Sequence, residues 1–133
     1  MEVKRGVIKN REYALQIRDF HGLKFGTITP TDIDGLIEYH NKYFIFIETK
    51  YKTGEVPHGQ KLALERLCDA TQRSGKPSLL MICTHESKGD IDVGETIVSE
   101  YRYKYCWKIP NKTVTAFRMV KGFIEKMEVV NGK

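Results

Sequence analysis

Long apolar runs are missing from this sequence, because none approaches the roughly 20 residues that a transmembrane helix needs. Residues 1–10 also lack the hydrophobic segment of a secretory signal peptide. Low-complexity segments, long linkers and internal repeats are absent as well. We therefore expect one cytoplasmic domain over residues 1–133, without a membrane partner.

Cysteine is scarce, and its arrangement excludes two classes of structure. The chain has Cys68, Cys83 and Cys106, an odd number with wide spacing and no C-x-x-C pair. Disulfide frameworks and zinc sites usually show paired or closely spaced cysteines. The sequence therefore predicts reduced, buried thiols.

The excess of positive charge is also small. The formal net charge is +5 at pH 7, which suits a polyanionic partner such as DNA. An excess of this size is common in proteins that never bind nucleic acid. Charge therefore favours a DNA partner only slightly.

Two apolar strands with acidic ends stand out in residues 31–50, TDIDGLIEYHNKYFIFIETK. A three-residue loop over 40–42, with Asn41 in the left-handed region, would place Tyr39 opposite Tyr43. The same register places Leu36 opposite Phe46, Asp34 opposite Glu48, and Asp32 opposite Lys50. A two-residue loop would shift the pairing by one and turn Asp34 to the other face. We predict the first register.

Carboxylates that face each other across a hairpin repel and need a positive partner. Oxygen ligands that converge from two strands suit Mg²⁺, with Mn²⁺ as a substitute, and water and substrate phosphate complete the shell of such an ion. Lys50 lies two residues after Glu48 and therefore on the same face. A lysine there can hold the attacking water or the phosphate. The arrangement predicts metal-assisted hydrolysis of phosphodiesters.

The order of these residues resembles the PD-(D/E)XK nuclease superfamily, which includes restriction endonucleases, phage-type exonucleases and Holliday-junction resolvases. Asp34-Gly35 is followed by a hairpin, by Glu48-Thr49-Lys50, and by Gln60 at the start of the next predicted helix. The resemblance covers about residues 10–85. It implies an α/β protein with a restriction-endonuclease-like mixed sheet of about four to five strands flanked by helices.

The resemblance also implies a Mg²⁺-dependent deoxyribonuclease and assigns roles to individual residues. The implied catalytic residues are Asp34, Glu48, Lys50 and Gln60, the implied metal ligands are Asp34, Glu48 and Thr49, and Glu12 and Asp32 are further candidates. The proline of the family motif is displaced, because Pro30 precedes Thr31-Asp32, so both Asp32 and Asp34 are candidate ligands. Glu12 also suits a first-turn glutamate that the helix dipole favours.

The remaining pattern predicts the other elements. We expect helices over about 10–20, 58–73 and 113–127, a short strand over 23–28, and a buried strand over 78–83. The last helix would bury Phe117, Val120, Ile124 and Met127. A helix between strands implies a crossover, and therefore a parallel strand added to the antiparallel hairpin.

Residues 96–110 alternate between aromatic and basic side chains. The segment predicts one strand with Tyr101, Tyr103, Tyr105 and Trp107 on one face and basic residues on the other. This alternation is typical of a half-buried edge strand, although aromatic and basic residues together also suit nucleic acid. We expect DNA contacts from Lys52, Arg102 and Lys104.

The leading hypothesis is a Mg²⁺-dependent DNA nuclease, for which selectivity for DNA structure and the absence of such selectivity are both open. The alternative is a catalytically inactive nucleic-acid-binding or interaction module on the same fold. A domain this small has little room for a separate recognition module, so we expect specificity to come from a homodimer or larger homo-oligomer, from a partner, or from substrate shape.

Overall fold

The computed structural model describes residues 19–131. The chain divides into two compact units, Met1–Pro30 and Thr31–Lys133. In the first unit, the described residues form a 3₁₀ helix, η1 (His21–Leu23), and an isolated antiparallel bridge between Phe25 and Ile28. The strand predicted over 23–28 is therefore wrong, because the chain reverses there at Gly26, whose φ is 64°. Glu12 and most of the predicted helix over 10–20 lie outside the described residues.

The second unit is an α/β structure with a five-stranded mixed sheet, and its strands lie in sequence order. The strands are β1 (Gly35–Tyr39), β2 (Tyr43–Tyr51), β3 (Ser78–His85), β4 (Ile97–Tyr103) and β5 (Cys106–Lys108). Only β2 and β3 run parallel, and the other neighbours are antiparallel. The predicted addition of a parallel strand to an antiparallel hairpin is confirmed.

The register of the first hairpin is the predicted one. Tyr39 pairs with Tyr43, and Leu36 pairs with Phe46. The loop turns through His40 and Asn41, whose φ angles are 51° and 60°. Positive φ at these positions matches the twist of the flanking strands.

The crossover between β2 and β3 is helix α2 (His58–Arg73), which has the predicted bounds. It begins after Pro57, which suits a helix start because proline has no N–H to leave unpaired. It ends before Gly75, whose φ is 96°. The first six residues of β3 are all buried, as expected for a central strand with both faces covered.

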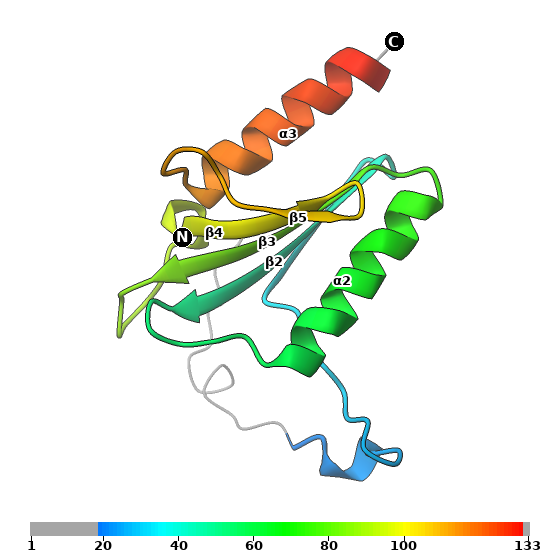
Figure 1. Ribbon diagram of the computed structural model, residues 1–133, viewed down its shortest axis with the longest axis vertical. Helices are drawn as coiled ribbons and strands as arrows, with labels where there is room; N and C mark the ends of the chain where they lie inside the picture. Colours follow the sequence, from blue (N-terminus) through cyan, green and yellow to red (C-terminus); the bar gives the residue numbers. More distant parts are fainter. Residues whose placement is uncertain (1–18, 132–133) are drawn as a thin grey trace, which may run out of the picture. The chain divides into compact units, whose positions relative to one another are not determined.

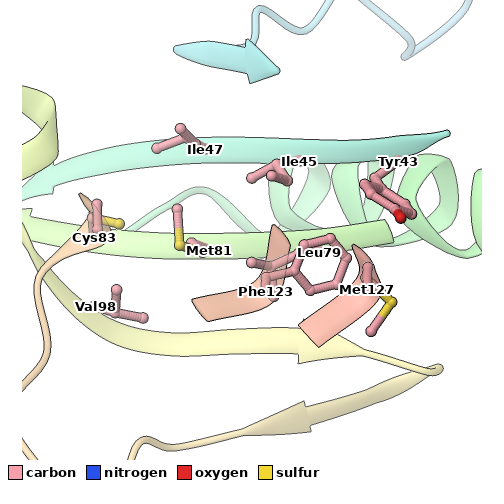
Figure 2. Packing of buried hydrophobic residues seen from close by; sticks show 10 residues of the cluster. Tyr43, Ile45, Ile47, Leu79, Met81, Cys83, Val98, Phe123 and Met127 are labelled. Atoms are coloured by element: carbon pink, nitrogen blue, oxygen red, sulfur yellow. The ribbon is translucent and has the colours of Figure 1, made fainter. Parts of the chain in front are cut away.

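The two long helices cover opposite faces of the sheet (Figure 1). Alternate residues of β2 therefore enter different cores. The core under α3 (Ala116–Asn131) includes Tyr43, Ile45, Ile47, Leu79, Met81, Cys83, Val98, Phe123 and Met127 (Figure 2). The smaller core under α2 contains Phe46, Leu64, Cys68 and Leu80. No helix of the described residues is long and apolar enough to cross a membrane.

Helix α3 starts later than predicted, and its buried stripe is displaced. Its first turn is capped by Thr115, whose Oγ1 accepts a hydrogen bond of 3.2 Å from the Arg118 N–H. Ala116, Phe123 and Met127 are buried, whereas Phe117 is 61% exposed. The assignment of Phe117 to the buried stripe is therefore wrong.

The predicted single strand over 96–110 is a hairpin. Strand β4 ends at Tyr103 and β5 starts at Cys106. Lys104 and Tyr105 form the turn, with φ angles of 49° and 68°. The turn places Trp107 opposite Arg102 and in contact with the core under α2, so the predicted shared face of Trp107 and Tyr103 is wrong.

Arg102 is a buried part of the link between α2 and the sheet. Its guanidinium donates two hydrogen bonds of 2.8 Å to the Asp69 carboxylate. Glu65 lies 3.8 Å away and also accepts a hydrogen bond from the Trp107 indole. Asp69 raises the pKa of Arg102, so the guanidinium stays charged. We therefore do not assign Arg102 to a DNA contact.

We predict that Arg102→Met lowers the free energy of unfolding by about 3 kcal/mol, because it leaves the partly buried Asp69 unpaired. The double variant Arg102→Met, Asp69→Leu should recover most of this loss, since neither charge then remains. Urea denaturation of both variants measures the effect. A double variant as unstable as Arg102→Met would contradict it, and Lys104→Met serves as the exposed control.

Candidate active site

Polar residues of two strand ends and one helix meet on the α2 face of the sheet. Glu48 lies near the end of β2, follows the buried Phe46 on this face, and is 6% exposed. Its neighbour on β3 is the buried Ile82. The apolar residues that fold β2 into the sheet centre therefore also bury this carboxylate.

Asp34 lies directly before β1, where the ladder with β2 ends at the pair Gly35 and Ile47. The predicted ladder pair of Asp34 and Glu48 is therefore absent. The Asp34 Oδ2 atom instead accepts hydrogen bonds of 2.8 Å from the Thr49 N–H and 2.9 Å from Thr49 Oγ1. Because the N–H and C=O of one strand residue face the same side, the Thr49 carbonyl also faces the Asp34 side.

Gln60, in the first turn of α2, holds Glu48 in place. Its Nε2 atom donates a hydrogen bond of 2.6 Å to Glu48 Oε2 and one of 3.4 Å to the Asp32 carbonyl. The amide thus connects the helix start, the buried carboxylate and the segment that leads into β1. The predicted approach of Gln60 to the open end of the hairpin is confirmed.

The environment of Glu48 disfavours its charge. Burial raises its pKa to about 7, and the negative charges of Asp34 and Asp32 add to the rise. Hydrogen bonds from the Asp34 backbone N–H and from the Gln60 side chain lower the pKa of Glu48 but do not compensate. A cation at this site would restore the ionised form.

Lys50 lies on the same face, two residues beyond Glu48, as predicted. It lines a cavity of about 210 Å³ together with Lys61 and Glu100. Glu100 forms an ion pair with Lys61, whose Nζ lies 3.1 Å from both Glu100 carboxylate oxygens. Among residues 19–131, no carboxylate lies within 4.0 Å of the Lys50 ammonium. Lys50 is therefore free to meet an anionic ligand.

The Glu48 carboxylate has an oxygen atom without a hydrogen-bond partner among the described residues. This buried atom is Oε1, and a missing partner is costly for a charged oxygen. No group of three or more His, Cys, Asp or Glu side chains within residues 19–131 is arranged to hold a metal ion. Mg²⁺ usually binds through only one or two carboxylates and keeps several waters. Asp34 and Glu48 fit that requirement.

A larger cavity, of about 490 Å³, lies at the end of β3. It is lined by Lys52, His85 and residues of the segment 86–97, and neither Glu48 nor Lys50 contributes to it. The smaller cavity is the more relevant one for chemistry, because its lining includes Lys50 and Ile82, the β3 neighbour of Glu48.

The three predicted DNA-binding residues are dispersed. Lys52 is exposed beyond β2, 3.5 Å from Glu86. Lys104 is exposed in the turn after β4, and Arg102 is buried against α2. The structure does not bring these side chains together.

The sequence analysis did not predict the polar contacts that join α2 to the sheet. Lys61, Glu65 and Asp69 recur every four residues, so they lie on one face of the helix. That face contacts Glu100, Trp107 and Arg102 of the sheet. A charged stripe beside the apolar stripe of Leu64 and Cys68 was the available signal.

Comparisons with protein-family models, with curated proteins and with solved structures found no match for this chain.

The raised pKa of Glu48 predicts that the metal-free protein loses stability as the pH rises from about 4.5 to 7. In this window the folded state keeps a proton on Glu48 that the unfolded state has released. The loss attributable to Glu48 should reach about 3 kcal/mol, at about 1.4 kcal/mol per pKa unit. Glu48→Gln should lack it, because a glutamine does not titrate.

Urea denaturation in EDTA, at pH 5 and at pH 8, measures this difference for the parent and for Glu48→Gln. Other acidic groups contribute equally to both proteins, so only the difference between the two pH profiles reports on Glu48. Parallel profiles would show that Glu48 is ionised in the folded state without a cation.

Proposed function

We propose that this protein is a Mg²⁺-dependent nuclease of the PD-(D/E)XK type that hydrolyses phosphodiester bonds of DNA. The observation that carries the proposal is the buried Glu48, whose Oε1 atom has no hydrogen-bond partner within residues 19–131, beside the carboxylate of Asp34. An uncompensated carboxylate lowers stability and needs another reason to be retained. A cation that participates in catalysis provides that reason.

The arrangement of the elements supports the proposal. An antiparallel hairpin, a crossover helix and a parallel strand follow one another, and helices cover both faces of the sheet. The structure is an α/β unit with a mixed sheet, and a restriction-endonuclease-like fold is part of the proposal. Fold by itself does not establish function, so the proposal depends on the residues at the end of β2.

Asp34, Glu48 and the Thr49 carbonyl are the groups that would hold the cation. Bound there, Mg²⁺ would lower the pKa of a coordinated water and offset the charge of the phosphate. We favour Asp34 over Asp32 as the ligand, because Thr49 orients the Asp34 carboxylate through two hydrogen bonds. Asp32 contributes its negative charge and the carbonyl that Gln60 binds.

The remaining roles follow from position and charge. Gln60 orients the Glu48 carboxylate, leaving Oε1 for the cation. Lys50 presents an unpaired ammonium on the same face, where it stabilises negative charge on the phosphate and on the attacking oxygen. The Lys61–Glu100 ion pair supports this role, because it engages Glu100, one of the two acidic residues that line the cavity shared with Lys50.

We predict that Mg²⁺ or Mn²⁺ raises the melting temperature of the protein, because the cation binds only the folded state. Asp34→Asn should remove this rise and keep the fold, since asparagine retains an oxygen for the Thr49 hydrogen bonds. Thermal unfolding with and without cation measures the effect. A full rise in Asp34→Asn would exclude Asp34 as the ligand and make Asp32→Asn the next variant.

We predict that Lys50→Ala lowers the DNA cleavage rate by roughly 10² or more, as expected for a lost electrostatic or acid–base group. DNA affinity, measured with Ca²⁺ to suppress cleavage, should change little. Lys52→Ala is the matched control, because Lys52 is exposed and should affect only binding. Lys50→Ala cleavage at the parent rate would refute the catalytic role.

Cleavage should be assayed on single-stranded, duplex, flapped and four-way DNA, because these substrates separate structure-selective from general nucleases. A protein that binds the cation and DNA but cleaves none of the four would be the inactive binding module.

A further inference from the structure

A group of three lysines surrounds one tyrosine ring on the other face of the sheet. The Nζ atoms of Lys104, Lys108 and Lys126 lie 5.5, 5.9 and 5.6 Å from the centroid of the Tyr103 ring. They come from the β4–β5 turn, from β5 and from α3. Tyr103 itself is anchored edge-on against Phe123 in the core under α3.

None of these three ammonium groups is neutralised. Within residues 19–131, no carboxylate lies within 4.0 Å of Lys104, Lys108 or Lys126. Other lysines of the protein do have acidic partners: Lys42 pairs with Glu128, and Lys61 pairs with Glu100. The lysines around Tyr103 therefore differ from Lys42 and Lys61, which form ion pairs within the fold.

Their proximity has an electrostatic cost. Two Nζ atoms that both lie within 5.9 Å of one centroid are at most about 12 Å apart, which is no more than about one and a half times the screening length of about 8 Å at physiological ionic strength. The tyrosine ring attracts each ammonium through its negative face, but it adds no countercharge. An anion between the lysines would relieve the repulsion.

We propose that Lys104, Lys108 and Lys126, gathered around Tyr103, form a second DNA-binding site that holds phosphates of the sugar–phosphate backbone. Lysines contact phosphates without reading sequence, and a fixed group of three is suited to a polyanion. The proposal rests on the proposed function for the choice of DNA as the polyanion. The site itself rests on the geometry around Tyr103.

The position of this lysine group shows what it would add to the nuclease. Tyr103 pairs with Leu79 of β3 and packs under α3, whereas Glu48 pairs with Ile82 and faces α2. The two sites are thus on opposite faces of the sheet and three residues apart along β3, or about 10 Å in that direction. One phosphate cannot contact both sites, so the lysine group holds a DNA segment that flanks the cleaved bond.

The test compares two triple variants that remove the same charge. Lys104→Ala, Lys108→Ala, Lys126→Ala removes the lysine group, and Lys112→Ala, Arg118→Ala, Lys121→Ala removes three exposed cations elsewhere. Affinity for a fluorescent duplex is measured across a salt series in EDTA, so that the candidate metal site plays no part. Melting temperatures confirm that both variants are folded.

The first triple variant should lose tenfold or more in affinity, and its salt slope should flatten by about 2 to 3, at about 0.9 per phosphate contact. The control should lose less than threefold. Replacing the same three lysines by arginine should retain binding, because arginine preserves the charge. Equal losses in both triple variants, or no duplex binding by the parent at low salt, would overturn the proposal.

Cleavage assays keep this inference separate from the nuclease proposal. If the parent binds DNA through the lysine group but cleaves none of the four substrates with Mg²⁺, the nuclease proposal fails and the second site stands. If cleavage depends on Lys50 while the two triple variants bind alike, the nuclease proposal stands and the second site is refuted.

Discussion

The parallel pairing of β2 and β3 is the constraint on which the rest of the unit depends. Parallel neighbours cannot be joined by a tight turn, so the chain must cross one face of the sheet. Helix α2 makes that crossing and buries the α2 face of both strands. Its first turn arrives beside the end of β2, which brings Gln60 to the Glu48 carboxylate. The buried acid and its orienting amide are thus consequences of one strand pairing.

Glu48 is a carboxylate in a buried position, where burial raises its pKa. This unfavourable placement points to a functional role for the residue. Elsewhere under α2, buried charge is matched, as in the bidentate contact of Arg102 with Asp69. At Glu48, by contrast, no cationic side chain of residues 19–131 lies within 4.0 Å, and the carboxylate is held by the neutral Gln60 amide and the Asp34 backbone N–H. Perturbed carboxylates of this kind concentrate at functional sites, which is why the proposed function is centred here.

The sequence by itself determined the hairpin register, the bounds of α2 and the parallel placement of β3. Each follows from a local rule. The length of the loop selects the hairpin register, and the change in apolar period from two residues to about four marks the helix. A helix between two strands implies a crossover, and therefore a parallel strand. The same rules placed Glu48 and Lys50 on one face, because alternation along a strand leaves no other choice. The turn at Lys104 and Tyr105 was missed because it contains no glycine, and the start of α3 was placed too early because Thr113 and Thr115 are both suitable N-cap residues.

Only the tertiary structure decided the partners of the charged residues. An arginine between tyrosines looks the same in sequence whether it meets phosphate or an aspartate 33 positions away, and here Arg102 meets Asp69. Likewise, Lys108 approaches Tyr103 only because β5 folds back, and the more distant Lys126 does so only because α3 packs across β4. Electrostatic partners depend on distances of a few ångströms between distant segments. Those distances are set by packing, which local sequence patterns do not encode.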